Sequence, residues 1–230
     1  AAPRRAAAAA HGRMGAPKKE DGFLGEMRAY AMKLHTKEQA PKEGQAEEPS
    51  KPMSKWEPTR ELYAQYLVDS KVVYDALEEV VASAPADSPL AVFQSTGLER
   101  GPALAKDLEF FESEYGIKAP EPTEAGSGYA AFLREKAASD VPGFMCHYYN
   151  VYFAHTAGGR QIGKMLSDMV LDGKKLEFYS WEGVLKDHMD GVRGSINSMA
   201  EGWSEEEKTA CLEETAPSFK YAGTLLRILA

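Results

Sequence analysis

The chain has 230 residues, of which 43% are hydrophobic and 27% are charged. This suits one globular domain whose core needs neither disulfides nor a structural metal. The net charge of −8 argues against nucleic acid as a partner, and no run of about 18 apolar residues is present that could span a membrane. Cys146 and Cys211 both lie in apolar helical stretches, so we expect buried thiols, as is typical of a reducing compartment.

The first segment differs in composition from the rest. Residues 1–19 contain five basic residues and no acidic one, and they are rich in alanine without an initiator methionine. This composition fits the remnant of an organelle transit peptide, and it fits an artificial tail or a natural disordered terminus equally well. We therefore expect 1–19 to be a disordered tail and 20–230 to form one domain.

Helical periodicity dominates the first half of that domain. The expected helices begin near Asp21, run from the N-cap Thr59 to before Pro85, cover 88–96, and extend from about Leu98 to Tyr115. Residues 41–55 hold three prolines and many charges and are expected to be an exposed linker.

The second half continues the helical pattern. After a loop over 116–128, the expected helices are 129–139, Pro142 to Leu171, about 176–202 with a break near Trp181, and 204–229. Ser204 followed by Glu207 forms a capping box for the last one. No alternating strand pattern occurs, so the fold class is expected to be all-α, in a single domain.

The strongest local signal is a glycine cluster inside a helical segment. Residues 147–163 read HYYNVYFAHTAGGRQIG, with Gly158, Gly159 and Gly163 among apolar residues at helical spacing. Each glycine costs a helix about 0.5–1 kcal/mol relative to alanine. Such a cluster indicates a kinked backbone or a backbone that lies against something wide and planar. We favour a large flat ligand lying across the glycines.

A histidine near the N-terminus fits such a ligand. His35 sits one residue past the apolar stripe of the first helix, Arg28 precedes it by two turns, and Gln39 follows it by four residues. A neutral imidazole oriented by a hydrogen bond to a partner such as Gln39 is what a haem iron needs as its proximal ligand. Taken alone, a histidine in this position is more often an ordinary residue at the boundary of an apolar face.

Six segments together resemble the heme oxygenases, in particular the plastid type of plants and algae. They read EMRAYAMKLHTKEQA, KWEPTRELYAQYLVDSKVVYD, STGLER, CHYYNVYFAHTAGGRQIG, LEFYSWEG and CLEETAPSFKYAGTLLR. Several are long and low in degeneracy, and the resemblance covers nearly all of residues 20–230. It implies a heme-oxygenase-like helical bundle with haem between a proximal helix and a glycine-kinked distal helix.

The resemblance also implies roles for individual residues. It places the axial iron ligand at His35, the distal backbone at Gly158, Gly159 and Gly163, and propionate contacts at Arg28, Tyr149 and Arg193. Arginine gives carboxylates charge-assisted, often bidentate hydrogen bonds, and a tyrosine hydroxyl adds a neutral donor. Without the resemblance, the arginines would be interpreted as solvated charges and Tyr149 as a core aromatic.

One position departs from the animal-type pattern of the family. There an aspartate precedes the glycine pair and organises distal water, whereas this chain has His155, as plant-type members do. We keep His155 as a candidate catalytic residue beside His35 and Gly158, and its side chain can face either the ligand or the protein. Asn150 and ordered water could supply part of the aspartate's role.

The reaction implied by the resemblance uses haem b as both cofactor and substrate. With O₂ and reduced ferredoxin it yields biliverdin IXα, CO and Fe²⁺, for bilin and phytochrome chromophore synthesis, in a monomeric enzyme of the plastid stroma. No flavin or nicotinamide motif is present, so electrons must come from outside. The acidic donor is expected to dock on a basic patch with Lys33, Lys37 and Lys42.

Two other kinds of function stay open at this point. A haem-binding relative without turnover would act as a buffer or regulator, although relatives of that kind lack the axial histidine that this chain has at position 35. A different enzyme on a helical bundle would need Glu-x-x-His pairs for a di-metal centre or an exposed cysteine paired with a base. Neither feature is found in the expected helices.

Overall fold

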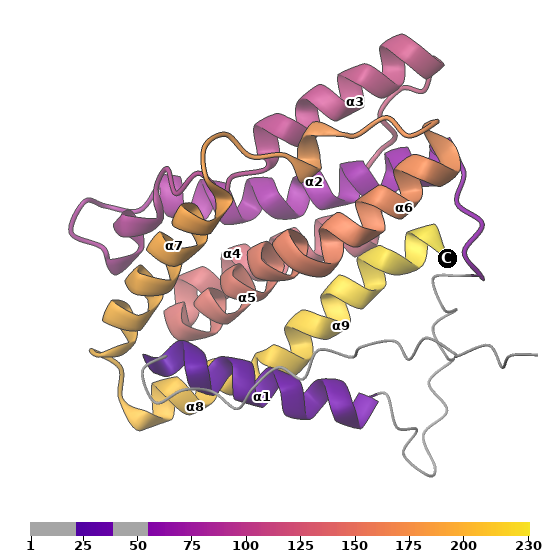
Figure 1. Ribbon diagram of the computed structural model, residues 1–230. Coiled ribbons are helices and arrows are strands. Elements are labelled where there is room, and N and C mark those ends of the chain that lie inside the picture. Colours follow the sequence, from indigo (N-terminus) through magenta and orange to yellow (C-terminus); the bar gives the residue numbers. More distant parts are fainter. Residues whose placement is uncertain (1–21, 39–54) are drawn as a thin grey trace, which may run out of the picture.

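The computed structural model describes residues 22–38 and 55–230, and within these ranges the regular elements are all helical (Figure 1). The α-helices are α1 (Gly22–Glu38), α2 (Arg60–Ala82), α3 (Gly101–Tyr115), α4 (Glu124–Ser139), α5 (Val141–Ala154), α6 (Arg160–Val170), α7 (Leu185–Ala200), α8 (Glu205–Glu213) and α9 (Thr215–Leu226). Short 3₁₀ turns are η2 (Pro89–Phe93), η4 (Glu177–Tyr179) and η5 (Arg227–Leu229), and η3 (His155–Gly159) is a π-helical turn. The expected tail and most of the expected linker lie outside the described residues.

Two helices form the centre of the bundle. The helix α2 packs against both α3 and α4, and it begins at the expected cap, where the Thr59 hydroxyl accepts a hydrogen bond from the backbone N–H of Leu62 at 3.2 Å. The helix α5 is buried around most of its circumference and contacts α4, α7, α8 and α9. Apolar side chains on all sides of a helix are typical of such a central position.

The first helix lies across one side of this bundle, beside α7, α8 and α9 (Figure 1). Its N-terminal end is fixed to α7, because the backbone N–H of Leu24 donates to the Asn197 side-chain oxygen at 3.0 Å. Phe23, Leu24 and Met27 are buried in the shared core. From this fixed end, α1 continues past α9.

The region before α3 is less helical than expected. The helix expected over 88–96 is only the 3₁₀ turn η2, and α3 begins at Gly101 instead of near Leu98. The backbone φ angles of Ser95 and Gly97 are +58° and +82°, which a right-handed helix does not contain. These two residues therefore end the helical pattern early.

The expected loop over 116–128 is shorter than predicted, because α4 already begins at Glu124. The Thr123 hydroxyl caps the helix by accepting a hydrogen bond from the backbone N–H two residues later, at 3.2 Å. Gly126 is a helix residue packed against α2, since a Cβ atom there would lie 2.7 Å from the Asp69 Cα. Its glycine serves close helix packing and not a turn.

The last two expected helices are each divided. Of the helix expected over 176–202, only the 3₁₀ turn η4 forms before the predicted break at Trp181, and α7 follows. The capping box at Ser204 is confirmed, but the helix expected over 204–229 splits into α8 and α9. Pro217 lies in the first turn of α9 and has no N–H to bond the preceding turn, which explains the division.

Both cysteines are buried and free, as expected. Within the described ranges, no helix combines the length and the apolar character needed to cross a membrane.

Candidate functional site

The glycine-rich segment forms a π-helical turn between two α-helices. The helix expected from Pro142 to Leu171 is present but interrupted, because α5 ends at Ala154, His155–Gly159 form η3, and α6 follows. A π turn adds one residue to a helical turn, which shifts the side chains around the axis, and such turns are frequent at functional sites. We refer to His155–Gly159 as the glycine turn.

The three glycines of this segment serve different purposes. A Cβ atom at Gly158 would have no neighbour within 4 Å in the part of the chain that the structure describes, so the backbone there faces open space. At Gly159 it would lie 2.7 Å from Nδ1 of His155, and at Gly163 it would lie 2.5 Å from the ring of Tyr179. These two glycines therefore make room for protein side chains. Of the three, Gly158 is the one that offers bare backbone to a ligand.

The His155 side chain faces the protein. Its Nε2 lies 2.7 Å from the carbonyl oxygen of Phe178, and its ring stacks on the Phe178 ring with centroids 4.0 Å apart. Because only an N–H can bond to that carbonyl, Nε2 carries the proton and Nδ1 does not. Burial lowers the pKa of His155 to about 3, so the imidazole is neutral at ordinary pH. Of the two orientations expected for His155, the structure therefore has the inward one.

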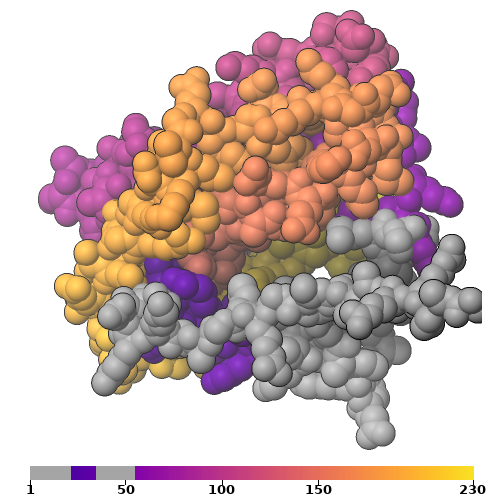
Figure 2. Space-filling view, in the orientation of Figure 1, coloured from indigo at the N-terminus to yellow at the C-terminus, as the bar shows by residue number. Residues whose placement is uncertain are grey.

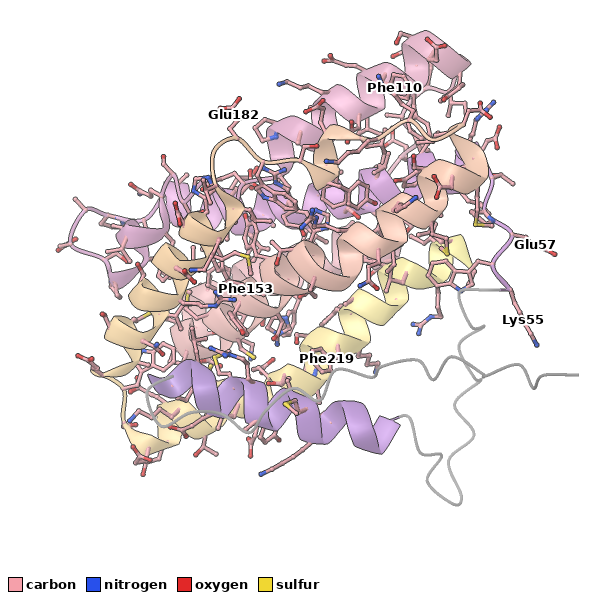
Figure 3. The ribbon with its side chains drawn as sticks, viewed as in Figure 1. Lys55, Glu57, Phe110, Phe153, Glu182 and Phe219 are labelled. Atoms are coloured by element: carbon pink, nitrogen blue, oxygen red, sulfur yellow. The ribbon has the colours of Figure 1, made fainter. Side chains whose placement is uncertain are left out.

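Two of the expected propionate contacts meet on one aromatic ring. Tyr149 is buried on α5, and its ring centroid lies 4.4 Å from that of Phe153. From α7, the Arg193 guanidinium lies over the same Phe153 ring at 5.0 Å from the centroid. Phe153 lies on α5, and Figure 3 labels it together with Phe219 of α9. The chain thus brings Tyr149 and Arg193 together across the α5–α7 boundary.

Arg193 has one N–H donor that none of the described residues accepts. Its Nη1 donates to the Asp190 carboxylate at 2.7 Å, within α7. Its Nε is buried and, among the described residues, has no hydrogen-bond partner. Buried donors in folded proteins are nearly always bonded, so this N–H indicates an acceptor that the described chain does not supply.

The proximal residues lie on α1. Arg28 is half-buried, and the backbone of His35 lies two turns further along the same helix. Residues seven apart in an α-helix share a face. The His35 side chain and the whole of Gln39 lie outside the described part of the chain, as does the expected hydrogen bond between them.

The surface is hollowed beside the α5–α6 region. Figure 2 shows yellow α9 at the floor of this hollow.

Comparison with known proteins decides the family. Residues 27–227 match the family model Heme oxygenase. The chain is 50% identical to Heme oxygenase 1, chloroplastic, of Arabidopsis thaliana, over 93% of this chain and 76% of the relative. It is 51% identical to the protein of the same name from Oryza sativa subsp. japonica, over 96% of this chain and 74% of the relative. The chain belongs to the heme oxygenase family.

A solved structure supports the same fold. The crystal structure of heme oxygenase-1 from the cyanobacterium Synechocystis, in complex with heme, superposes with a TM-score of 0.68 at 18% identity and covers 90% of each chain. The expected all-α heme oxygenase fold and the enzyme class are thus confirmed, and haem is the substrate of this heme oxygenase.

The residues present fit a haem in this heme oxygenase. Bare backbone at Gly158 allows a flat ring to approach, and the Arg193 Nε, which bonds to none of the described residues, can donate to a carboxylate. Gly163, in contrast, packs on Tyr179, and Asn150 donates its side-chain N–H to the Ser218 hydroxyl of α9 at 2.8 Å. Asn150 is therefore engaged with α9 and is not aligned with the glycine turn.

Sequence reasoning missed the protein partners of the glycine turn. These are Phe178 and Tyr179, which lie in the LEFYSWEG segment quoted for the family resemblance. The sequence signal for these two residues is the aromatic pair itself, which lies in a segment of low degeneracy. Its contact with His155 runs through a backbone carbonyl, which has no sequence signature.

Proposed function

We propose that this heme oxygenase converts haem b, with O₂ and reduced ferredoxin, to biliverdin IXα, CO and Fe²⁺. The product would feed bilin synthesis, including phytochrome chromophore, in the plastid stroma. The observation that carries this proposal is the open backbone at Gly158, which follows the helix that holds Tyr149, together with the Nε of Arg193 on α7, which bonds to none of the described residues. The chloroplastic relatives support the plastid location.

The proposed roles divide between two sides of the haem. On the proximal side, His35 is the iron ligand, Gln39 orients its imidazole, and Arg28 binds a propionate. On the other side, Tyr149 and Arg193 hold propionates. Bound haem supplies the iron that activates O₂ and the ring carbon that is oxidised. The protein residues bind it, orient it and limit the access of water.

The glycine turn is proposed to select the edge of the ring that reacts. Backbone at Gly158 lies against the ring with no side chain between them, and Gly159 and Gly163 keep the neighbouring backbone in place through His155 and Tyr179. His155 supports this turn from behind, as a neutral buried imidazole, and does not itself exchange protons with the ligand. Ordered water near the turn would then be the proton source.

Electron delivery is proposed to use the positive charges of α1. Ferredoxin is acidic, so Lys33, with Lys37 and Lys42 further along the chain, would attract it by electrostatic steering. We propose a monomeric enzyme that meets this donor in solution. Turnover with ferredoxin should fall as salt rises from about 20 to about 500 mM, because the Debye length shrinks several-fold. Flat activity over this range would contradict steering.

The deciding experiment is His35→Ala. The wild-type chain should bind haem with a histidine-type Soret band and release biliverdin IXα when supplied with reduced ferredoxin. The variant should lose that band and its turnover, and added imidazole should restore both in part. Wild-type turnover by the variant without imidazole would overturn the ligand assignment. A wild-type chain that binds haem and releases no biliverdin would instead be a haem buffer.

A further inference from the structure

The connection between α6 and α7 is held by two buried charged residues of the α3 region. We call residues 176–181 of this connection the strap; it includes η4 and crosses α2 beside α3 (Figure 1). The two carboxylate oxygens of Asp107 accept hydrogen bonds from the backbone N–H groups of Glu177 and Phe178, at 2.8 and 2.7 Å. One carboxylate therefore fixes two successive peptide groups of the strap.

Arg100 holds the same strap through its carbonyl oxygens. Its Nη1 donates to the carbonyl of Ser180 and more weakly to that of Glu177, at 3.4 Å. Its guanidinium also lies over the Trp181 ring at 4.6 Å from the centroid. Asp107 and Arg100 are thus both buried, and each bonds to strap backbone and not to the other.

The strap in turn holds the glycine turn at two points. The carbonyl of Phe178 accepts the His155 Nε2–H at 2.7 Å, so a single residue bonds Asp107 through its N–H and His155 through its C=O. The Tyr179 ring fills the notch at Gly163. His155 and Gly163 flank Gly158 on either side. Movement of the strap must therefore move the backbone around Gly158.

Burying Asp107 is costly, which makes a purely packing role a poor explanation. A buried carboxylate stays ionised only with strong donors, and both of its oxygens are used here on one short segment. We propose that Asp107 is a positioning residue: it fixes the strap and thereby, through Phe178 and His155, the place of the Gly158 backbone against haem. This inference rests on the proposed contact between Gly158 and haem.

The groups around Asp107 explain its unusual titration. Burial raises the pKa of Asp107 to about 6, against the strap N–H bonds and Arg100, which lower it; Glu177 raises it further. Tyr63 on α2 and Tyr179 in the strap also face it. Because an exposed aspartate has a lower pKa, protonation below about pH 6 relieves the cost of burying the charge and does not by itself release the strap.

The test compares two buried carboxylates that both accept hydrogen bonds from backbone N–H groups. Asp107→Asn keeps the shape of the side chain, but its NH2 group would face one of the two strap N–H groups and could not accept a hydrogen bond from it. Asp69→Asn is the matched control, because Asp69 is also buried and accepts from the Thr123 N–H and hydroxyl, both at 2.7 Å, at the start of α4. Hydrogen exchange of the full-length apoprotein, followed by mass spectrometry, measures protection of peptides that cover 155–163.

We expect Asp107→Asn to speed exchange over 155–163 at least about tenfold, which is the loss of one charge-assisted hydrogen bond. Asp69→Asn should leave that segment at the wild-type rate and speed exchange near residue 123. Wild-type protection in Asp107→Asn, or equal loss in both variants, would overturn the proposal. If Asp107→Asn does not fold, Asp107→Glu is measured instead with Asp69→Glu as its control, because the longer side chain cannot bond the N–H groups of Glu177 and Phe178 in the same positions and should also speed exchange over 155–163. Unchanged protection would overturn the proposal as well.

A second readout addresses the haem. With haem and reduced ferredoxin, Asp107→Asn should release a mixture of biliverdin isomers, whereas the wild type and Asp69→Asn should release a single one. A single isomer from Asp107→Asn, identical to the wild-type product, would contradict the positioning role. Failure of the wild type to bind or convert haem would refute the proposed function instead, and the exchange measurements distinguish the two cases.

Discussion

Tyr179 occupies the space that a side chain at position 163 would need. A Cβ atom on Gly163 would lie 2.5 Å from the Tyr179 ring, and the Tyr179 hydroxyl accepts a hydrogen bond from that of Tyr63 at 3.2 Å. Both tyrosines are buried, so the ring cannot retreat without losing this bond and its packing. The close approach of α6 and the strap therefore depends on a glycine at this position.

Gly163→Ala should destabilise the protein by about 1–3 kcal/mol, the usual cost of overpacking a buried contact. Gly158→Ala is the matched control, because the same methyl group would enter open space and alanine is the better helix former. Urea unfolding of the two apoproteins measures the difference. Haem titration should show the reverse order, with Gly158→Ala the weaker binder. Equal unfolding free energies for the two variants would contradict the separate roles of these glycines.

His155 should make the protein sensitive to acid. Burial lowers its pKa to about 3, whereas an unfolded chain protonates histidine near pH 6.5. Its contribution to stability is therefore complete above pH 6.5 and is lost as the pH falls toward the folded value. At pH 5 the loss is about 2 kcal/mol. His155→Phe keeps a ring against Phe178 and removes the titration, so its unfolding free energy should fall less between pH 7.5 and pH 5 than that of the wild type. Parallel pH curves for the two proteins would rule out a neutral buried His155.

The helices could be predicted where the sequence carries its own boundary signals. Thr59 and Ser204 cap helices that begin where the pattern places them. Glycine makes helix boundaries hard to predict, because it can either end a helix or allow close packing within one. Gly116 ends α3 with a φ of +67°, whereas Gly126 lets α4 lie against α2. Only the tertiary contact distinguishes the two cases.

The sequence predicted which residue types form the candidate site better than it predicted which residues they contact. The glycine cluster correctly indicated an interrupted helix, yet Gly159 and Gly163 face His155 and Tyr179 and not open space. The direction of His155 could not be predicted, because its partner is the carbonyl of Phe178, which every residue possesses. The role of Asp107 could not be predicted for the same reason, because both of its hydrogen bonds go to backbone N–H groups.

A buried polar chain ties α4 and α5 to the junction of α8 and α9, away from the glycine turn. The Tyr129 hydroxyl lies 2.8 Å from Nδ1 of His147, whose Nε2 lies 3.0 Å from Glu214; the other Glu214 oxygen binds Lys136 at 2.6 Å. Burial raises the pKa of Glu214, but the bonds from Lys136 and His147 outweigh it, and the pKa is lowered overall. The stabilising effect of this carboxylate is therefore present near neutral pH and is lost in acid.

Glu214→Gln should lower the unfolding free energy at pH 7 by about 1–3 kcal/mol, because two charge-assisted hydrogen bonds are weakened. Glu213→Gln, one residue earlier and exposed, is the control and should have almost no effect. The difference between the two variants should shrink from pH 7 to about pH 3, because the pKa of Glu214 lies below its ordinary value and the wild-type carboxylate is protonated only in that acid range. Guanidinium unfolding at both pH values measures it, and a constant difference would show that charge at Glu214 does not matter.

Arg193 offers the sharpest test of the propionate assignments among the described residues. Its Nε is buried without a hydrogen-bond partner in the described chain, while its guanidinium already rests on Phe153. Arg193→Met keeps the apolar stem and removes the donors, so haem should bind about tenfold more weakly or worse. Arg134→Met is the matched control, since Arg134 of α4 forms an exposed ion pair with Glu79 of α2. Haem titration followed at the Soret band measures both constants. Because a donor buried without an acceptor lowers stability, apo Arg193→Met should unfold no more easily than the wild type, and a marked loss of apoprotein stability would mean that Arg193 serves the fold and not the haem.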